Sequence, residues 1–172
     1  MTRYKLRQRL FSLGEDYDVE DADGHTLFHV DGKLFRIRET FVIEDRQGQE
    51  VVTIKQKLLA LRKTMTIERD GATIATIRKA LFAPFGDTFA VELVDGTELH
   101  AHGDIFAHEY LILRWKQTVA EISKRWFAFT DTYGITIAPG EDESLILAVA
   151  VAIDELAHDP DETHHGPQGH TI

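Results

Sequence analysis

Three side chains able to bind a metal stand at alternate positions in the segment "ELHAH". Glu98, His100 and His102 fall on one face if this segment is a β-strand, because successive side chains of a strand point to opposite faces. Two imidazoles and a carboxylate are ligands that zinc and similar borderline metals accept. The plainer interpretation is a solvated outer face that binds nothing. The pattern therefore gives a candidate metal site at Glu98, His100 and His102, and with it the hypothesis of a metal-dependent enzyme that uses the His100/His102 face.

A second candidate site is basic and lies in the segment "KQKLLALRK". Lys55 and Lys57 alternate with apolar residues along a predicted strand and should point outward, while Arg62 and Lys63 follow across a short connection. Such a cluster can hold phosphate groups through charge-assisted hydrogen bonds. Its plainer interpretation is a solvated face that protects a sheet edge from pairing with another chain. We take Lys55, Lys57, Arg62 and Lys63 as the candidate binding site for an anionic lipid head group or another small anionic ligand.

Signatures of other catalytic chemistry are missing from the sequence. The serines Ser12, Ser123 and Ser144 lie outside any Gly-x-Ser-x-Gly motif, and there is no phosphate-binding glycine loop. The chain has no cysteine, which excludes thiolate catalysis, disulfides and cysteine-based zinc sites. The acidic segment "DYDVEDADG" does not fit a calcium-binding EF-hand loop, because aspartate stands where that loop requires glycine. We therefore expect no cofactor, and the sequence favours a binding module without enzymatic activity.

Length, composition and charge indicate a single globular domain. The 172 residues, of which 43% are hydrophobic, are enough for one sizeable core. The formal net charge of -10 argues against nucleic acid as a partner. The basic start "MTRYKLRQRLF" lacks the apolar core of a secretory signal, so we expect a cytoplasmic protein. The apolar run from Leu145 to Ile153 is shorter than the roughly 20 residues that span a bilayer, so we expect no transmembrane segment.

Most of the chain has the two-residue periodicity of antiparallel β-strands. Turn signals that end in glycine recur every 23 to 25 residues, at Gly24, Gly48, Gly71 and Gly96, which is the length of a hairpin with its connections. Between these turns apolar and polar residues alternate, as in strands with one buried face. The predicted strands lie near residues 16–21, 25–31, 34–45, 50–58, 63–69, 72–80, 87–94, 97–102, 108–116, 118–125 and 131–138. Because so many antiparallel strands expose edges unless the sheet closes or stacks, we expect either a closed β-barrel or two packed sheets.

The segment that follows the strands predicts a buried helix. Leu145 to Ile153 are nine consecutive apolar residues, preceded by the helix start "EDES" and followed by the polar "DELAHD". A helix that is apolar on every face must be surrounded by protein. In a chain of antiparallel strands this favours a closed barrel, with a central helix near residues 143–158 inside it. The tail, residues 160–172, combines proline, glycine and charge without periodicity and is predicted to be disordered.

The order of these features resembles a known family. In "VAEISKRWFAFTDTYGITIAPGEDESLILAVAVAIDELAHD" a Lys-x-Trp strand is followed by an aspartate-bearing turn, a Tyr/Ile strand and a terminal hydrophobic helix. This order resembles the LURP-one-related family, which shares the Tubby C-terminal-like fold with the phospholipid scramblases. The resemblance covers residues 3–159 and is best over residues 119–155. It implies a mainly β domain over residues 1–159, a closed antiparallel barrel of about 12 strands around a buried C-terminal helix.

The resemblance implies little about function, because LURP-one-related proteins mostly lack a defined biochemical activity. Tubby-like domains bind phosphoinositides, and scramblases act on lipids with a calcium-binding segment and an acylated cysteine cluster. This chain has no cysteine, so that anchor is absent. We expect a non-enzymatic cytoplasmic binding module for anionic lipid head groups or another small anionic ligand. The alternatives are the metal-dependent enzyme described above and a purely structural or protein-interaction domain.

Overall fold

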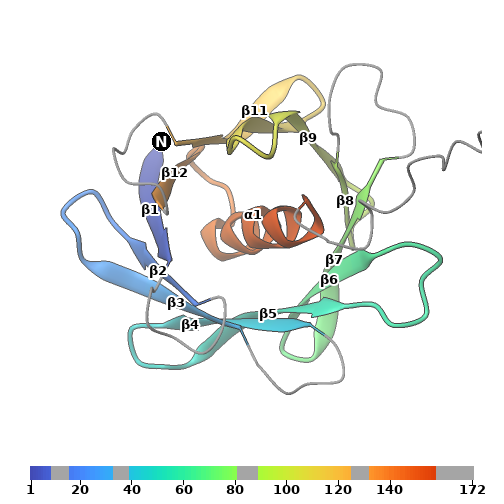
Figure 1. Ribbon diagram of the computed structural model, residues 1–172, viewed down its shortest axis with the longest axis horizontal. Coiled ribbons are helices and arrows are strands. Elements are labelled where there is room, and N and C mark those ends of the chain that lie inside the picture. Colours follow the sequence, from blue (N-terminus) through green and yellow to red (C-terminus); the bar gives the residue numbers. More distant parts are fainter. Residues whose placement is uncertain (9–15, 33–38, 81–88, 125–131, 158–172) are drawn as a thin grey trace, which may run out of the picture.

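The computed structural model describes residues 1–8, 16–32, 39–80, 89–124 and 132–157. Within these ranges the chain forms twelve β-strands followed by one α-helix (Figure 1). The elements are β1 (Thr2–Gln8), β2 (Tyr17–Glu20), β3 (Thr26–Gly32), β4 (Thr40–Asp45), β5 (Glu50–Gln56), β6 (Thr64–Arg69), β7 (Ala72–Lys79), β8 (Phe89–Leu93), β9 (Glu98–Asp104), β10 (Glu109–Arg114), β11 (Gln117–Ser123), β12 (Thr132–Ile137) and α1 (Glu143–Ala157).

The strands form a closed antiparallel barrel. Each strand pairs with its neighbours in sequence, and β1 pairs with both β2 and β12, which closes the sheet. Closure removes the unpaired edges that an open sheet of this size would expose. The prediction of a mainly β, closed antiparallel barrel with about 12 strands is therefore confirmed.

The strand that closes the barrel, β1, is not among those predicted from the sequence. In β1 the side chains of Tyr4 and Leu6 are buried, whereas Arg3 and Arg7 are exposed. Two buried apolar positions are too few for periodicity to distinguish a strand from a charged terminus. The strand is held by partners from distant parts of the sequence, as where Tyr4 lies opposite Ile135 of β12.

The connections between antiparallel strands alternate between the two ends of the barrel. The glycine turns predicted from the sequence all lie at one end, together with the start of α1, and we call this the turn end. The Asp21 carboxylate there accepts hydrogen bonds from two N–H groups of its own turn, and Gly24 has the positive φ of 83° that the turn requires. The opposite end, the loop end, carries residues 57–63 and 105–108 within the described chain, together with the last residues of α1.

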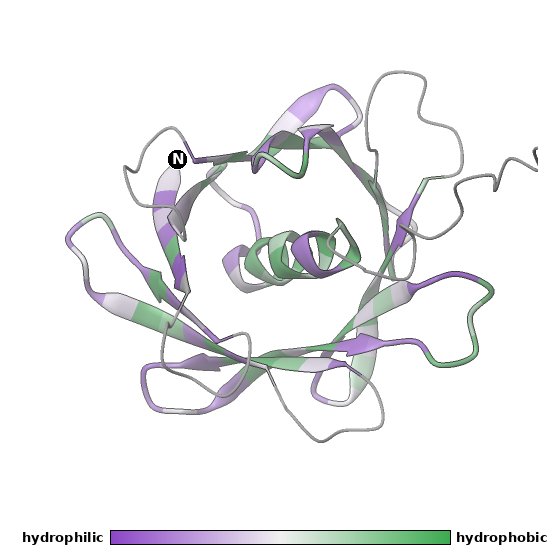
Figure 2. Ribbon diagram, viewed as in Figure 1, coloured by the Kyte–Doolittle hydropathy of each residue, from purple (hydrophilic) through white to green (hydrophobic). Residues whose placement is uncertain are grey.

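The helix α1 fills the interior of the barrel. The Asp142 carboxylate accepts a hydrogen bond from the N–H of Leu145 at 3.1 Å, which caps the start of the helix. The same carboxylate forms two hydrogen bonds with Arg69 of β6, at 2.7 and 3.0 Å. Val149 and its neighbours are fully buried, and α1 contacts β5, β6, β7 and β12. Figure 1 shows α1 enclosed by the ring of strands, and Figure 2 shows its apolar residues, as the sequence predicted.

The described residues end before the predicted end of the domain. The barrel and helix extend from Thr2 to Ala157. The predicted boundary at residue 159 and the predicted disordered tail, residues 160–172, lie outside the described residues. The predicted strand at residues 34–45 is described only from Glu39, and there it forms β4.

Candidate functional site

One connection at the loop end exposes apolar side chains. Residues 57–63 join β5 to β6, and we call the part that precedes Lys63, residues 57–62, the leucine loop. Leu58 is 56% exposed, Leu59 is 98% exposed, and Leu61 is fully exposed. A single exposed leucine is ordinary on a protein surface, but three exposed leucines within four residues of one loop concentrate apolar surface there and point to an interaction. In Figure 2 the loop projects from the barrel between β5 and β6, apolar in its middle and hydrophilic on both sides.

Two of the four predicted basic residues are bound to carboxylates. Lys55 forms an ion pair with Glu68 on the adjacent strand β6. Lys63, whose side chain is 12% exposed, lies 2.9 Å from a carboxylate oxygen of Glu39 and 3.1 Å from one of Glu155 in α1. Burial alone would lower the pKa of Lys63, but its hydrogen bonds to these two carboxylates outweigh burial and raise that pKa. Lys55 therefore links β5 to β6, and Lys63 links the end of the connection between these strands to α1.

The other two predicted basic residues, Lys57 and Arg62, stand at the two ends of the leucine loop. Both are exposed, and within the described part of the chain neither side chain forms an ion pair. The N–H of Lys57 donates a hydrogen bond to the carbonyl of Thr64 at 2.8 Å, and the Thr64 hydroxyl donates one to the carbonyl of Arg62 at 3.0 Å. These bonds close the base of the loop, so the two cations flank the exposed leucines.

The predicted metal-binding face is partly assembled. Glu98, His100 and His102 alternate with buried residues of β9 and share its outer face, as predicted. The Nε2 atom of His100 lies 3.6 Å from the Glu98 carboxylate. The side chain of His102 does not join them in a group compact enough to surround one metal ion. Metal binding at this face stays a prediction.

In the described residues, the compact group of possible metal ligands lies instead in the turn between β2 and β3. Ligand atoms of Asp21, Asp23 and His25 lie within 4.8 Å of one another. The Asp21 carboxylate accepts hydrogen bonds from the N–H groups of His25 and Asp23, both at 2.9 Å, and these bonds hold the pKa of Asp21 below its usual value. The geometry of an aspartate-stabilised turn therefore accounts for this cluster.

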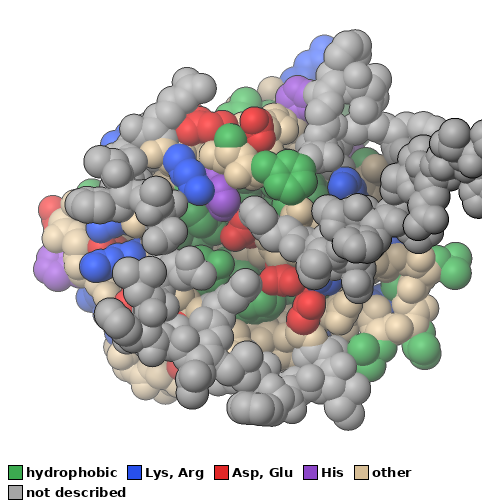
Figure 3. Space-filling view, in the orientation of Figure 1, with side chains coloured by type: hydrophobic (Ala, Val, Ile, Leu, Met, Phe, Trp, Pro, Cys, Tyr) green, Lys and Arg blue, Asp and Glu red, His purple; other side chains and the backbone are tan. Residues whose placement is uncertain are grey.

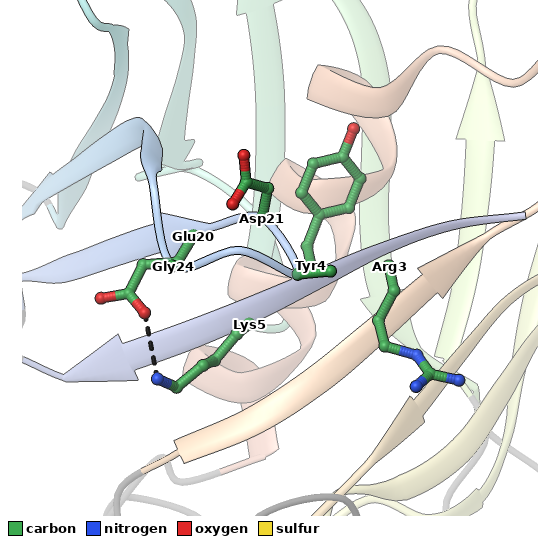
Figure 4. Close-up of a pocket in the computed structure, with 7 residues that line it drawn as sticks. Arg3, Tyr4, Lys5, Glu20, Asp21 and Gly24 are labelled. Atoms are coloured by element: carbon green, nitrogen blue, oxygen red, sulfur yellow. Dashed lines mark hydrogen bonds and ion pairs between the residues drawn. The ribbon is translucent and has the colours of Figure 1, made fainter.

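A small pocket of about 270 Å³ lies beside this turn (Figure 4). The residues that line it come from β1, β2 and the turn: Arg3, Tyr4, Lys5, Glu20, Asp21, Ala22 and Gly24. Figure 4 shows the Lys5 ammonium reaching the Glu20 carboxylate, at 3.0 Å. Because Glu20 already neutralises Lys5, the pocket offers a weaker attraction for anions than the exposed cations of the leucine loop.

A buried polar cluster at the loop end was not predicted. The Nε2 atom of His108 lies 2.8 Å from the carboxylate of Asp154 in α1, and the His108 ring lies against Tyr133 with centroids 4.6 Å apart. Burial, together with the negative charge of Asp154, raises the pKa of Tyr110 and Tyr133 well above the usual value. The cluster joins the end of α1 to the wall of the barrel. Its one signal in the sequence is Asp154, the first polar residue after the long apolar run.

The fold defines the class of protein: a closed barrel of twelve antiparallel strands around a buried C-terminal helix. The model of the LURP-one-related family matches residues 2–154, so the chain belongs to the LURP-one-related family, and the resemblance seen in the sequence is confirmed. In the described chain, α1 is not long enough to be a membrane-spanning helix.

Known proteins that are similar to this chain include a bacterial and a plant protein. The Bacillus subtilis (strain 168) protein YxjI, described as uncharacterised, is 27% identical over 163 residues, which are 93% of this chain and 82% of that protein. An X-ray structure of an Arabidopsis thaliana protein matches with a TM-score of 0.67 and 15% identity, over 91% of this chain and 92% of that one. The second likeness supports the barrel fold alone.

Proposed function

We propose that this protein is a non-enzymatic binding module that holds phosphate-bearing anionic groups, such as lipid head groups, at its leucine loop. The observation that carries the proposal is the pair of exposed cations, Lys57 and Arg62, which form no ion pair with the described residues. Of the four residues in the predicted site, Lys55 and Lys63 support the strands that carry the loop. Lys57 and Arg62 are the residues that contact the ligand.

The acidic character of the whole chain does not prevent this binding. The formal net charge is -10, but screening at physiological salt limits the repulsion from distant carboxylates to about 8 Å. Near an anionic surface each Lys or Arg contributes on the order of 1 kcal/mol. Lys57 and Arg62 together then contribute about 2 kcal/mol, which is roughly a 30-fold change in affinity. The interaction should weaken as salt is added, because both contacts are exposed.

A charge reversal with a matched control tests the proposal. Lys57→Glu/Arg62→Glu reverses both loop cations, and Arg46→Glu/Lys116→Glu reverses two exposed cations in turns at the opposite end. The net charge changes equally in both double variants. Binding is measured to phosphatidylcholine vesicles that contain phosphatidylserine, by sedimentation, and to inositol hexakisphosphate, by calorimetry.

We expect the binding affinity of the loop variant to fall roughly 30-fold or more and that of the control variant to change little. The proposal is wrong if the two double variants behave alike, or if the unmodified protein binds neither probe at low salt.

A further inference from the structure

We infer that the leucine loop inserts into the surface of an anionic lipid bilayer, so that the ligand is a membrane interface rather than a soluble phosphate compound. This inference rests on the proposed function and names its ligand class. The inference follows from the exposure of the leucine side chains, for which the binding of an anion by Lys57 and Arg62 gives no reason. Leu58, Leu59 and Leu61 occupy three of the four positions between the cations of the loop.

The loop has the amphipathic order that an interfacial segment needs. Its leucines lie between the two cations in the sequence, and the backbone hydrogen bonds of Lys57 and Arg62 with Thr64 place both cations at the base of the loop. Cations at that position can contact head groups while the leucines reach the acyl boundary below them. A soluble phosphate ligand would engage the cations and leave all three leucines in water.

The shape of the loop also favours a membrane over a partner protein. The loop is a convex tip that projects from the barrel in Figure 1, and Figure 3 shows apolar side chains standing out from the same side of the molecule. A bilayer accepts a convex apolar tip without a preformed groove, and its anionic head groups complement cations on both sides of that tip. A protein partner would instead need a groove that matches this tip.

The base of the loop limits the entropy lost on binding. Lys63 is fixed between Glu39 and Glu155, so the chain leaves the leucine loop from a position tied to α1. Only the exposed tip has to become ordered at the membrane. Since burial of one leucine is worth about a tenfold change in affinity or more, two leucines can contribute more than the two cations.

The absence of cysteine allows a site-specific test. Leu59→Cys carries a single environment-sensitive fluorophore on the leucine loop, and Gln47→Cys carries the same label on an exposed turn at the other end of the barrel. Phosphatidylcholine vesicles that contain phosphatidylserine should shift the emission of the label at position 59 to shorter wavelength. Spin-labelled acyl chains should then quench it. The label at position 47 should not respond.

An unlabelled double variant, Leu59→Ser/Leu61→Ser, supplies the second readout. Both leucines are solvent-exposed, so the melting temperature should stay unchanged. Vesicle affinity should fall at least tenfold, while calorimetric binding of inositol hexakisphosphate should be unaffected.

The outcomes separate the inference from the proposed function. Vesicle binding that depends on Lys57 and Arg62 but not on the leucines, with no fluorescence shift at position 59, overturns insertion and leaves anion binding standing. A shift at position 59 that is indifferent to salt and to charge reversal supports insertion and overturns the proposed role of the cations. No response to vesicles overturns the inference, as does a response of the label only to a purified protein partner.

Discussion

Replacing Lys63 tests whether this lysine stabilises the fold rather than binding the ligand. Lys63→Met keeps most of the length of the side chain but removes the ammonium between Glu39 and Glu155. Removing one partner of a fully buried ion pair costs about 3–5 kcal/mol. The cost is lower here because the Glu39 side chain is 42% exposed, and exposed pairs contribute less than about 1 kcal/mol. We expect the free energy of unfolding to fall by about 1–3 kcal/mol.

Thermal and urea unfolding measure this loss. For a chain of this size a change of 1 kcal/mol shifts the melting temperature by about 2–4 °C. Lys57→Met is the matched control, because Lys57 lies in the same connection between β5 and β6, is exposed and has no ion pair in the described chain. The control should change stability by less than about 0.5 kcal/mol and should weaken vesicle binding instead.

The pH dependence of stability gives a second test, because the direction of the change can be predicted. The pKa of Lys63 is raised in the folded protein, so its stabilisation is complete below the pKa of an unfolded lysine and is lost as pH rises through the folded value. Burial already raises the pKa of Glu39, and in Lys63→Met no ammonium opposes that shift. The deficit of the variant should therefore shrink as pH falls and the carboxylates bind protons. Equal stability of the two methionine variants at neutral pH, or a deficit that grows on acidification, would refute this reasoning.

Three further changes test the fold that carries the loop. Val149→Asp puts a carboxylate into the fully buried centre of α1 and should prevent folding, since an unpaired buried charge costs several kcal/mol; soluble protein with an unchanged melting temperature would contradict the internal helix. Gly103→Ala should lower the melting temperature more than Gly96→Ala. Both glycines have positive φ, but a Cβ at Gly103 would lie 2.6 Å from a backbone oxygen of β10, whereas a Cβ at Gly96 would meet open space. Asp142→Ala should cost about 1–2 kcal/mol through loss of the helix cap and of the partly exposed bond to Arg69. Burial acts to raise the pKa of the Asp142 carboxyl, but the hydrogen bonds of this carboxylate outweigh burial and lower that pKa. The stabilisation by Asp142 should therefore be present above the unfolded pKa and lost as pH falls through the folded value. An Asp142→Ala variant whose stability deficit persists unchanged in acid would contradict this.

The barrel could be predicted because its signals are local. Alternation and the recurring glycine turns identify strands one hairpin at a time, and the apolar run from Leu145 to Ile153 needs no partner to be recognised as buried. Strand β1 was missed for the opposite reason. Its identity depends on β2 and β12, and its own pattern supplies only Tyr4 and Leu6 as buried positions.

The candidate site could be predicted only in part, because ion pairs depend on the three-dimensional arrangement. The sequence placed four cations near one loop but could not show that Lys55 faces Glu68, or that Lys63 meets the end of α1. The exposure of the leucines could not be predicted either, since "KLLALRK" also fits the end of a buried strand. The contact between His108 and Asp154 joins two distant segments, and no periodicity reports such a pair.

Hydrogen–deuterium exchange of the unmodified protein, with and without vesicles of phosphatidylcholine and phosphatidylserine, tests the central claim most directly. It locates the contact without any substitution. We predict that vesicles slow exchange in residues 57–63 and leave the turn at residues 45–49, at the opposite end of the barrel, unchanged. Protection confined to the turn end, or no protection in the leucine loop under conditions where the protein sediments with the vesicles, would contradict the claim that this loop is the membrane-binding site.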